Sequence, residues 1–354
     1  MKSSYREEDV KILLKDITGM VQPRPTEERE RLIQSGRHYS EMLPVEYVPS
    51  LAYMEAYREA LAAYAGATAE AVAALADVVA ARRGREVTLV SLARAGIPIG
   101  ILLKRRLEQR FSMQIPHYAV SIIRGRGMDD NAMRYILDRH PAGTLLFVDG
   151  WIGKGAISGE LRRCVRAYPG VSPELAVAAD PAGITELCGT HEDILIPSSC
   201  LNSTVSGLIS RTFLRADVIG PRDFHGAVYY GELAEADLSY EFIHAIENKF
   251  PQKREESGNI PETENRMWKD RGMDEVKEIA ARFGVSDLHL IKPGIGETTR
   301  VLLRRIPWKI LIGAGQEQEL AHIRRLAQER GVDIVSYPLR HYKACGIIRK
   351  IADM

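Results

Sequence analysis

A stretch in the middle of the chain combines one acid, two glycines and a lysine, residue types that together suit the binding of a phosphate group. Residues 145–148 are all apolar and predict a buried strand of a parallel sheet. Asp149 follows directly, and Gly153, Lys154 and Gly155 lead into a predicted helix. Glycines let the backbone approach an anion closely, and a helix N-terminus offers free amides and a partial positive charge. This order predicts an anion site at a strand end, with Asp149 placed to hold sugar hydroxyls or a metal-bound water.

Two further loops are predicted to reach the same edge of the sheet. An apolar segment at 87–92 predicts a strand that runs into the small-residue loop 93–98. The strand predicted at 117–123 ends in the charged loop 124–131. Because ligands of doubly wound sheets bind beyond the carboxyl ends of the strands, these two loops and the loop 149–157 are expected to converge.

The elements that would position these loops alternate between strand and helix patterns. This alternation predicts an α/β protein with a parallel, doubly wound sheet flanked by helices. Residues 51–83 are Ala-rich with apolar residues at helical spacing, and we expect two helices there with a turn near 66–68. The first domain is therefore expected to span residues 1–250, of which residues 1–85 form a helical cover.

A second domain is expected after a linker. Residues 251–270 are polar and charged with little apolar content, which predicts a linker. Residues 271–354 alternate helix and strand patterns, with a last helix near Ala344, and predict a small α/β/α sandwich. This part holds fifteen Lys and Arg against ten Asp and Glu, a net charge of +5, whereas the whole chain carries +1.

Several other chemistries fit the sequence poorly. A Walker A loop needs Ser or Thr after its Gly-Lys pair, but Gly155 follows Lys154, and a dinucleotide fingerprint needs a glycine where Ser158 stands. The four cysteines are scattered without CxxC spacing, which argues against a zinc site and a disulfide framework. No apolar run approaches the length that crosses a bilayer and no signal-peptide core is present, so a cytoplasmic protein without a membrane partner is expected.

The strand, acid and Gly-rich turn resemble the phosphoribosyltransferase fingerprint, in which two acids precede a Thr-rich phosphate loop. Asp149 takes the place of the first acid, and Gly150 stands where the second would be. The resemblance implies a type I phosphoribosyltransferase-like sheet. It also implies that phosphates are bound by Ala93, Ala95, Gly96, Gly153, Lys154, Gly155, Ala156 and Ile157.

Over nearly its whole length the chain resembles a narrower bacterial phosphoribosyltransferase family of tellurite-resistance and stress gene clusters, which carries a C-terminal Pelota-type RNA-binding domain. The segments that carry this resemblance are 38–42, 90–96, 121–124 and 147–157. It implies transfer chemistry between phosphoribosyl pyrophosphate and a nucleobase-like acceptor, with Mg²⁺, in a stress-linked pathway to a nucleoside-like metabolite. Arg94 would hold pyrophosphate and Arg124 or Arg126 would close over it. Asp149 would hold the ribose and orient Mg²⁺-bound water.

Two alternatives to a transferase stay open. The missing second acid at Gly150 leaves room for a sensor that binds a phosphoribosyl compound without turnover. Some members of the resembled family are named StiP-like cysteine proteases, and such a hydrolase needs a thiol beside a histidine. Cys200, in the polar segment 198–207, is the best candidate nucleophile, with His191 or His225 as its base.

The C-terminal domain contains a turn that resembles the RNA-contacting turn of the Pelota and kink-turn-binding ribosomal protein fold. The implied RNA-binding residues are Gly294, Ile295, Gly296, Glu297, Thr298, Thr299 and Arg300. Arg304 and Lys343 would add contacts to RNA phosphates. A non-binding or dimerising domain is the alternative, so structured RNA and a second copy of the chain are the macromolecular partners under consideration.

Overall fold

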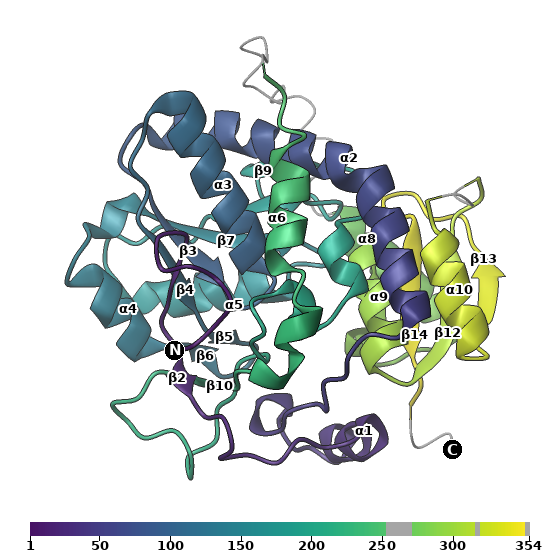
Figure 1. The fold of residues 1–354 in the computed structure, drawn as a ribbon. Helices are drawn as coiled ribbons and strands as arrows, with labels where there is room; N and C mark the ends of the chain where they lie inside the picture. Colours follow the sequence, from purple (N-terminus) through teal and green to yellow (C-terminus); the bar gives the residue numbers. More distant parts are fainter. Residues whose placement is uncertain (253–270, 316–318, 351–354) are drawn as a thin grey trace.

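The structure is a computed structural model that describes residues 1–252, 271–315 and 319–350, so most of the predicted linker lies outside the described residues. A six-stranded sheet with the order β1-β4-β3-β7-β8-β9 runs through the first part of the chain (Figure 1). All five pairings are parallel. The strands are β1 (Lys11–Ile12), β3 (Thr88–Leu92), β4 (His117–Val120), β7 (Leu145–Trp151), β8 (Leu175–Ala179) and β9 (Cys188–Thr190).

Helices cover both faces of this sheet, as the sequence predicts. Leu89 and Leu146 pack with helices α2, α3 and α6 on one face, whereas Val90 and Phe147 pack with α4 and α5 on the other. Burial on both faces explains why the strands are apolar runs. The parallel sheet flanked by helices is confirmed, but a phosphoribosyltransferase-type fold is not. The helices are α1 (Thr26–Gln34), α2 (Leu51–Arg83), α3 (Gly96–Phe111), α4 (Asp130–Leu137), α5 (Ala156–Cys164) and α6 (Ser239–Glu247).

Short strands complete the first part of the chain. Strand β1 adds an edge to the central sheet, so the N-terminal cover is not purely helical. The remaining pairs are β2 (Lys15–Asp16) with β10 (Gly226–Ala227) and β5 (Ile122–Ile123) with β6 (Gly127–Met128).

Helix α2 is one continuous element of 33 residues, and the predicted turn near 66–68 is wrong. Ser50 caps its start by accepting a hydrogen bond from the Tyr53 amide, and Gly84, with φ +65°, ends it. Gly66 lies inside the helix, where glycine costs about 1 kcal/mol relative to alanine. Burial of neighbours such as Ala69 and Val72 outweighs that cost.

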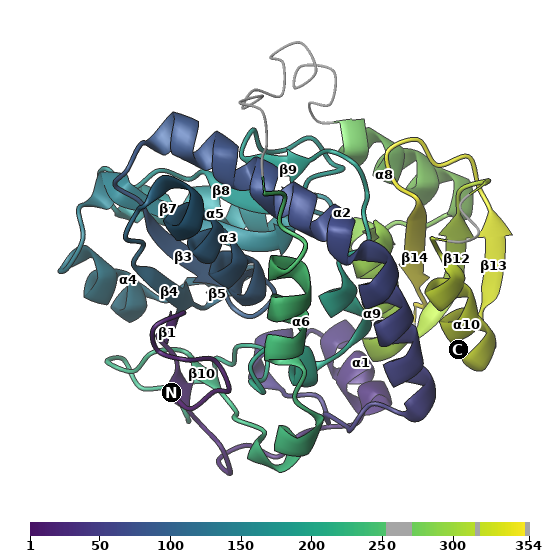
Figure 2. The same ribbon diagram turned by 45° about the horizontal axis from the view of Figure 1, so that its top comes forward.

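The same helix is long and apolar enough, by length and composition alone, to cross a membrane over Tyr53–Arg83. This contradicts the expectation that no apolar run reaches such a length. However, 56% of its most apolar window is buried inside the protein. A buried core helix passes the same test, so this one helix is weak support for a membrane protein (Figure 2).

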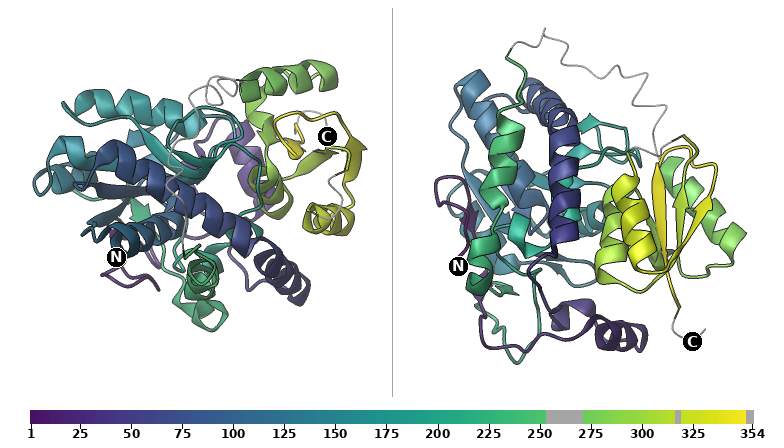
Figure 3. Two further views of the ribbon diagram at one scale, coloured as in Figure 1. Left: turned by 90° about the horizontal axis from the view of Figure 1, so that it is seen from above. Right: turned by 45° about the vertical axis from the view of Figure 1, so that its right-hand side comes forward.

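The C-terminal part forms a second sheet with the order β11-β14-β12-β13 and helices on both faces. It packs beside the first sheet, and the N-terminal half of α2 reaches alongside it, where Glu59 pairs with Arg325 over 3.0 Å (Figure 3). The helix predicted near Ala344 is wrong, because this apolar segment is the buried central strand β14. The elements are α8 (Arg271–Phe283), β11 (Ile291–Pro293), α9 (Ile295–Arg304), β12 (Pro307–Ile312), α10 (Ala321–Glu329), β13 (Asp333–Ser336) and β14 (Ala344–Ile348).

Candidate functional site

The predicted phosphate loop after β7 is covered by the C-terminal domain. Lys154 donates hydrogen bonds from Nζ to the carbonyl oxygens of Leu288 and Ile291. Tyr342 donates from its hydroxyl to the carbonyl oxygen of Gly153 over 2.8 Å. Burial lowers the pKa of Lys154 to about 8. In this arrangement the loop holds the second domain in place.

Asp149 and the loop after β3 do meet, as the sequence predicts. A side chain at Gly150 would come within 3.3 Å of the carbonyl oxygen of Ala95, and one at Gly96 within 2.3 Å of the carbonyl oxygen of Val148. Gly96 therefore permits the close approach of α3 to β7. Asp149 accepts a 2.8 Å hydrogen bond from the Gly150 amide. Burial raises the pKa of Asp149 to about 6.

The third predicted loop is engaged with other segments. Arg124 reaches His289 of the C-terminal domain, with 3.5 Å between Nη1 and Nδ1. Arg126 forms an ion pair with Glu41. These contacts hold the two arginines against neighbouring side chains, and none of them involves Asp149.

Ala156 and Ile157, predicted to bind phosphate, form the first turn of α5. Gly155 precedes them with φ +81°, and a side chain there would come within 3.0 Å of Ile184. Ile157 packs against the apolar cluster beneath α5. Phosphate binding by residues 153–157 stays a prediction, as does the Mg²⁺ ion assigned to Asp149. The described residues contain no group of three or more His, Cys, Asp or Glu side chains arranged to hold a metal.

The turn predicted to bind RNA faces the first domain. Asp193, which is 6% exposed, accepts hydrogen bonds from the amides of Ile295 at 3.0 Å and Lys343 at 2.9 Å. A side chain at Gly296 would come within 2.5 Å of the ring of Trp151. The loop 149–155 and the turn 294–300 therefore meet, and we call this contact the domain seam.

Polar side chains of the turn are also engaged inside the protein. Glu297 and Arg300 form a 2.9 Å ion pair, and the Arg300 guanidinium lies 4.3 Å from the centre of the Trp151 ring, a cation–π distance. Thr298 and Thr299 are fully buried. RNA binding through these residues is not tested by the structure, and it would require the seam to open.

The cysteine chosen from the sequence has neither of its expected bases. Cys200 is 3% exposed, and burial raises the pKa of its thiol to about 12. His225 Nδ1 lies instead 2.8 Å from the hydroxyl oxygen of Ser121. His191 lies beside a different thiol, that of Cys188, with 3.6 Å between Sγ and Nε2.

Cys188 and His191 form a compact group with Asp180. The two ring nitrogens of His191 lie 3.6 and 3.7 Å from Sγ of Cys188, and Nδ1 lies 2.9 Å from the carbonyl oxygen of Asp180. The Asp180 carboxylate accepts backbone hydrogen bonds through Oδ2, but its buried Oδ1 has no hydrogen-bond partner in the described structure. Burial raises the pKa of the Asp180 carboxyl and of the Cys188 thiol. A thiol at the start of β9, an imidazole just after β9 and an acid just after β8 are thus brought together.

A cavity of about 180 Å³ borders this group on the side of His191. Its wall continues into the C-terminal domain. The lining residues are His191, Glu192, Asp193, Gly313, Ala314, Leu339, Arg340, His341, Tyr342 and Lys343. A ligand in this cavity would contact both domains and the imidazole.

Sequence reasoning did not single out Cys188, Asp180 or Asp193. A signal for the first was present, because Cys188 and His191 stand three residues apart, one at the start of β9 and the other just after it. Asp193 gave no local signal, because its partners lie more than 100 residues away in the sequence.

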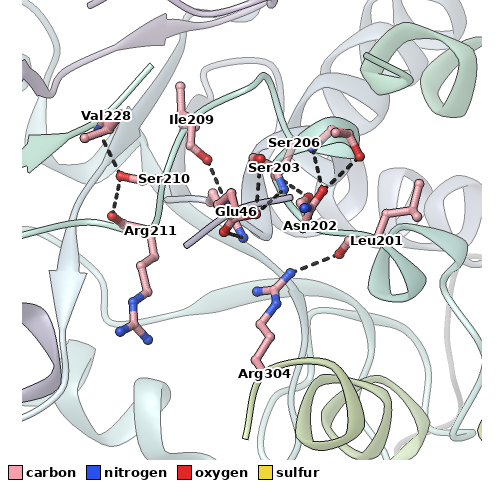
Figure 4. Close-up of polar contacts among 12 residues, drawn as sticks. Glu46, Leu201, Asn202, Ser203, Ser206, Ile209, Ser210, Arg211, Val228 and Arg304 are labelled. Carbon is pink, nitrogen blue, oxygen red and sulfur yellow. Dashed lines mark hydrogen bonds and ion pairs between the residues drawn. The ribbon is translucent and has the colours of Figure 1, made fainter. Parts of the chain in front are cut away.

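A second pocket lies between the loop after β3, the segment 198–206 and helix α9, and has a volume of about 20 Å³. Arg94, Arg300 and Arg304 line it together with polar residues of the segment 198–206. Figure 4 shows Arg304 donating to the carbonyl oxygen of Leu201, over 3.0 Å. The sequence predicted Arg94 at a binding loop, and the structure brings Arg304 of the other domain to the same pocket.

Comparison with known proteins agrees with much of the sequence-based resemblance. Residues 3–247 match the model of a family described as tellurite-like stress resistance cysteine protease StiP, and residues 270–350 match the PELOTA RNA binding domain. A protein of Acinetobacter baylyi named cysteine protease StiP is 35% identical, over 98% of this chain and 94% of its own length. An aminotransferase structure from Anaerococcus prevotii covers 97% of this chain and 87% of its own at 10% identity, but its TM-score of 0.23 supports no conclusion.

These findings correct the predicted activity. The matched family and relative are named cysteine proteases, which contradicts the assignment as a phosphoribosyltransferase and the associated description as a magnesium-dependent transferase. Phosphoribosyl pyrophosphate and its acceptor were inferred from that reaction, and no contact in the structure tests their binding. The stress-related family and the C-terminal Pelota domain are confirmed. With one model matching well over half of the sequence and a relative aligned over nearly all of it, the chain belongs to the StiP family of tellurite-like stress resistance cysteine proteases.

Proposed function

We propose that this protein is a thiol-dependent peptide hydrolase in which Cys188 is the nucleophile and His191 the base. The observation that carries this proposal is the 3.6 Å distance between Sγ of Cys188 and Nε2 of His191. Family membership supports the reaction class. Cys200, the nucleophile favoured by sequence, is replaced in this proposal because its expected bases lie elsewhere.

The chemistry follows from the position of His191. With Nδ1–H donated to the Asp180 carbonyl oxygen, Nε2 is the unprotonated ring nitrogen, and it lies 3.6 Å from Sγ of Cys188. The imidazole takes the thiol proton, the thiolate attacks the peptide carbonyl carbon, and the amine leaves with the proton from His191. Water then hydrolyses the thioester and restores the thiol. The carboxylate of Asp180 stabilises the imidazolium that forms between these steps.

In this structure the Cys188 thiol is not accessible to a substrate. Cys188 is fully buried, and burial holds its pKa above the ordinary value, so the thiol stays protonated. The cavity beside His191 is the route by which a peptide would approach. Because the C-terminal domain supplies most of its wall, loosening that domain is expected to raise thiol reactivity.

A peptide hydrolysis assay on the full chain, with fluorescently labelled casein, tests the proposal. Cys188→Ala is expected to reduce the rate by about a hundredfold or more, because it removes the nucleophile. Cys345→Ala is the matched control, since that thiol is also fully buried but lies in β14. Hydrolysis by Cys188→Ala at the rate of the Cys345→Ala control would overturn the assignment, and circular dichroism of both variants checks folding.

We also propose that residues 270–350 bind structured RNA, because they match an RNA-binding domain model. The turn 294–300 is engaged in the seam, so the full chain is expected to bind RNA weakly until the seam opens. Asp193→Ala removes the carboxylate that holds the Ile295 and Lys343 amides and is expected to strengthen binding. Filter binding across a salt series measures this, and the absence of salt-dependent retention in both proteins would refute RNA binding.

A further inference from the structure

Four buried arginines from distant parts of the sequence, Arg29, Arg94, Arg211 and Arg304, lie near one another, since burial and the charges of the other three lower the pKa of Arg211. Three of them, Arg29, Arg94 and Arg304, also lie near the carboxylate of Glu46. Arg94 pairs with it over 3.4 Å, and its side chain is 8% exposed. Burial lowers the pKa of Arg29, Arg211 and Arg304. Both oxygens of Glu46 are in use, because Oε2 accepts from the amide and hydroxyl of Ser203 (Figure 4).

The remaining positive charges of this group have no carboxylate partner within ion-pair distance in the described structure. Glu30, the next acid, is held by Arg305 through two hydrogen bonds of 2.7 and 2.8 Å. Among the described residues, Arg211 donates to the carbonyl oxygens of Tyr39 and Met42, at 3.3 and 3.4 Å, and its guanidinium lies 5.7 Å from the centre of the Tyr39 ring. Buried charges are ordinarily paired or neutralised, so an uncompensated group of this kind calls for a counter-ion.

Unused hydrogen-bonding groups point to the same conclusion. Nε of Arg29, Nε of Arg211 and the hydroxyl of Tyr230 are buried without a hydrogen-bond partner in the described structure. Arg29 is 3% exposed and Tyr230 is 7% exposed. Each such group is costly unless something binds it. The two guanidinium Nε atoms can only donate, which favours an anion over a cation, and the Tyr230 hydroxyl can donate as well.

Two of the four arginines, Arg94 and Arg304, line the pocket of about 20 Å³ described above. Its other walls carry Ser198, Asn202 and Ser206, whose side chains offer further polar contacts. Two N–H groups of one guanidinium can donate to two oxygens of the same phosphate. The small volume excludes a macromolecule and selects a compact group.

We propose that the pocket lined by Arg94 and Arg304 is a binding site for a compact phosphate-bearing anion, and that the nearby buried charges of Arg29 and Arg211 add to its attraction for an anion. The ligand bridges Arg94 of the first domain and Arg304 of the second, and so fastens the domains together. This site is separate from Cys188 and does not depend on the hydrolase assignment. It requires binding only, with no reaction.

Inorganic phosphate is the probe for the full-length chain, with chloride at equal ionic strength as the reference. Calorimetry and thermal unfolding are expected to show saturable binding that raises the unfolding midpoint, since a ligand of the folded state stabilises it. Arg304→Gln is expected to weaken binding at least about tenfold, by analogy with the loss of one charge-assisted pair. Arg340→Gln is the control, because Arg340 lies in the same domain and its side chain is 55% exposed.

Arg304→Lys is the second variant, used in case glutamine prevents folding. It keeps the charge but loses the planar fork, and is expected to weaken binding less than Arg304→Gln does. Without phosphate, Arg304→Gln is not expected to unfold at a lower temperature than Arg340→Gln, since it relieves the crowding of buried positive charges. A phosphate response that does not saturate, or one that is equal in Arg304→Gln and Arg340→Gln, would overturn the proposal.

Discussion

The ends of β7 and β9 lie in one parallel sheet, separated only by β8, and they differ in how they are used. The end of β7 carries the acid, glycines and lysine that predict a ligand site, but the C-terminal domain binds to it. The region of β9 carries little that resembles a motif, but Cys188 at the start of this strand and His191 just after it meet beside a cavity.

This difference teaches what a motif can and cannot predict. Spacing after a strand predicts where a loop lies, because strand and helix geometry are local. What covers that loop depends on residues far along the chain. Lys154 bonds to a carbonyl 134 residues away, and this partner decides that its ammonium group faces protein rather than a ligand.

The largest change in stability is expected from a substitution that places a clashing side chain in the domain seam. Gly296→Ala would place a methyl group 2.5 Å from the Trp151 ring, so we expect a loss of about 2–3 kcal/mol of unfolding free energy. Denaturant unfolding of the full chain measures the loss. If the β7 end were an open ligand site, this substitution would leave stability unchanged.

Gly159 provides the matched control for this substitution. It also lies in a helix, α5, but a side chain there meets nothing within 4 Å. Gly159→Ala is expected to stabilise the protein by roughly 0.5–1 kcal/mol, because alanine is the better helix former. Equal effects at both positions would show that backbone propensity, and not the seam, explains the result.

Local sequence signals predicted the fold better than the site. Apolar runs at 87–92 and 145–148 became the paired strands β3 and β7, and Gly96, expected in the loop 93–98, begins helix α3 and lies against Asp149. The sequence wrongly predicted a turn near Gly66, because glycine weakens a helix locally. The packing of neighbouring residues decides that helix α2 continues through it. The approach of Asp180 to Cys188 and His191 depends on how β8 and β9 align, which no local spacing rule predicts.

The pH dependence of the free energy of unfolding tests whether Asp149 contributes to stability or opposes it. Burial raises its pKa to about 6 from 3.8, so the folded chain binds this proton more tightly than the unfolded chain. The stability gained is complete below about pH 4 and is lost as the pH rises through about 6. Asp149→Asn is expected to unfold with roughly 2 kcal/mol more free energy than the parent at pH 7, and with a flatter profile between these values.

Asp217 is the control for this substitution. It is an exposed acid whose pKa is lowered by its hydrogen bond with Arg215, whereas the pKa of Asp149 is raised by burial. Asp217→Asn is therefore expected to leave the profile between pH 4 and 6 nearly unchanged. A stabilised Asp149→Asn would show that the acid at the β7 end opposes folding, which is the behaviour of a residue kept for binding. A destabilised variant would make the acid part of the seam itself.

The smallest effect concerns the lysine of the same loop. Lys154→Met removes two hydrogen bonds to buried carbonyl oxygens but also removes a charge whose burial is unfavourable, and we expect a net loss of about 1 kcal/mol. Lys277→Met is the control, because that side chain is 61% exposed and pairs only with Asp274 across one helical turn. Urea unfolding of both variants distinguishes two roles for the loop. If Lys154 serves to dock the second domain, its replacement lowers stability. If it is held ready for an anion, its replacement raises stability, because the substitution then mainly removes an unfavourable buried charge.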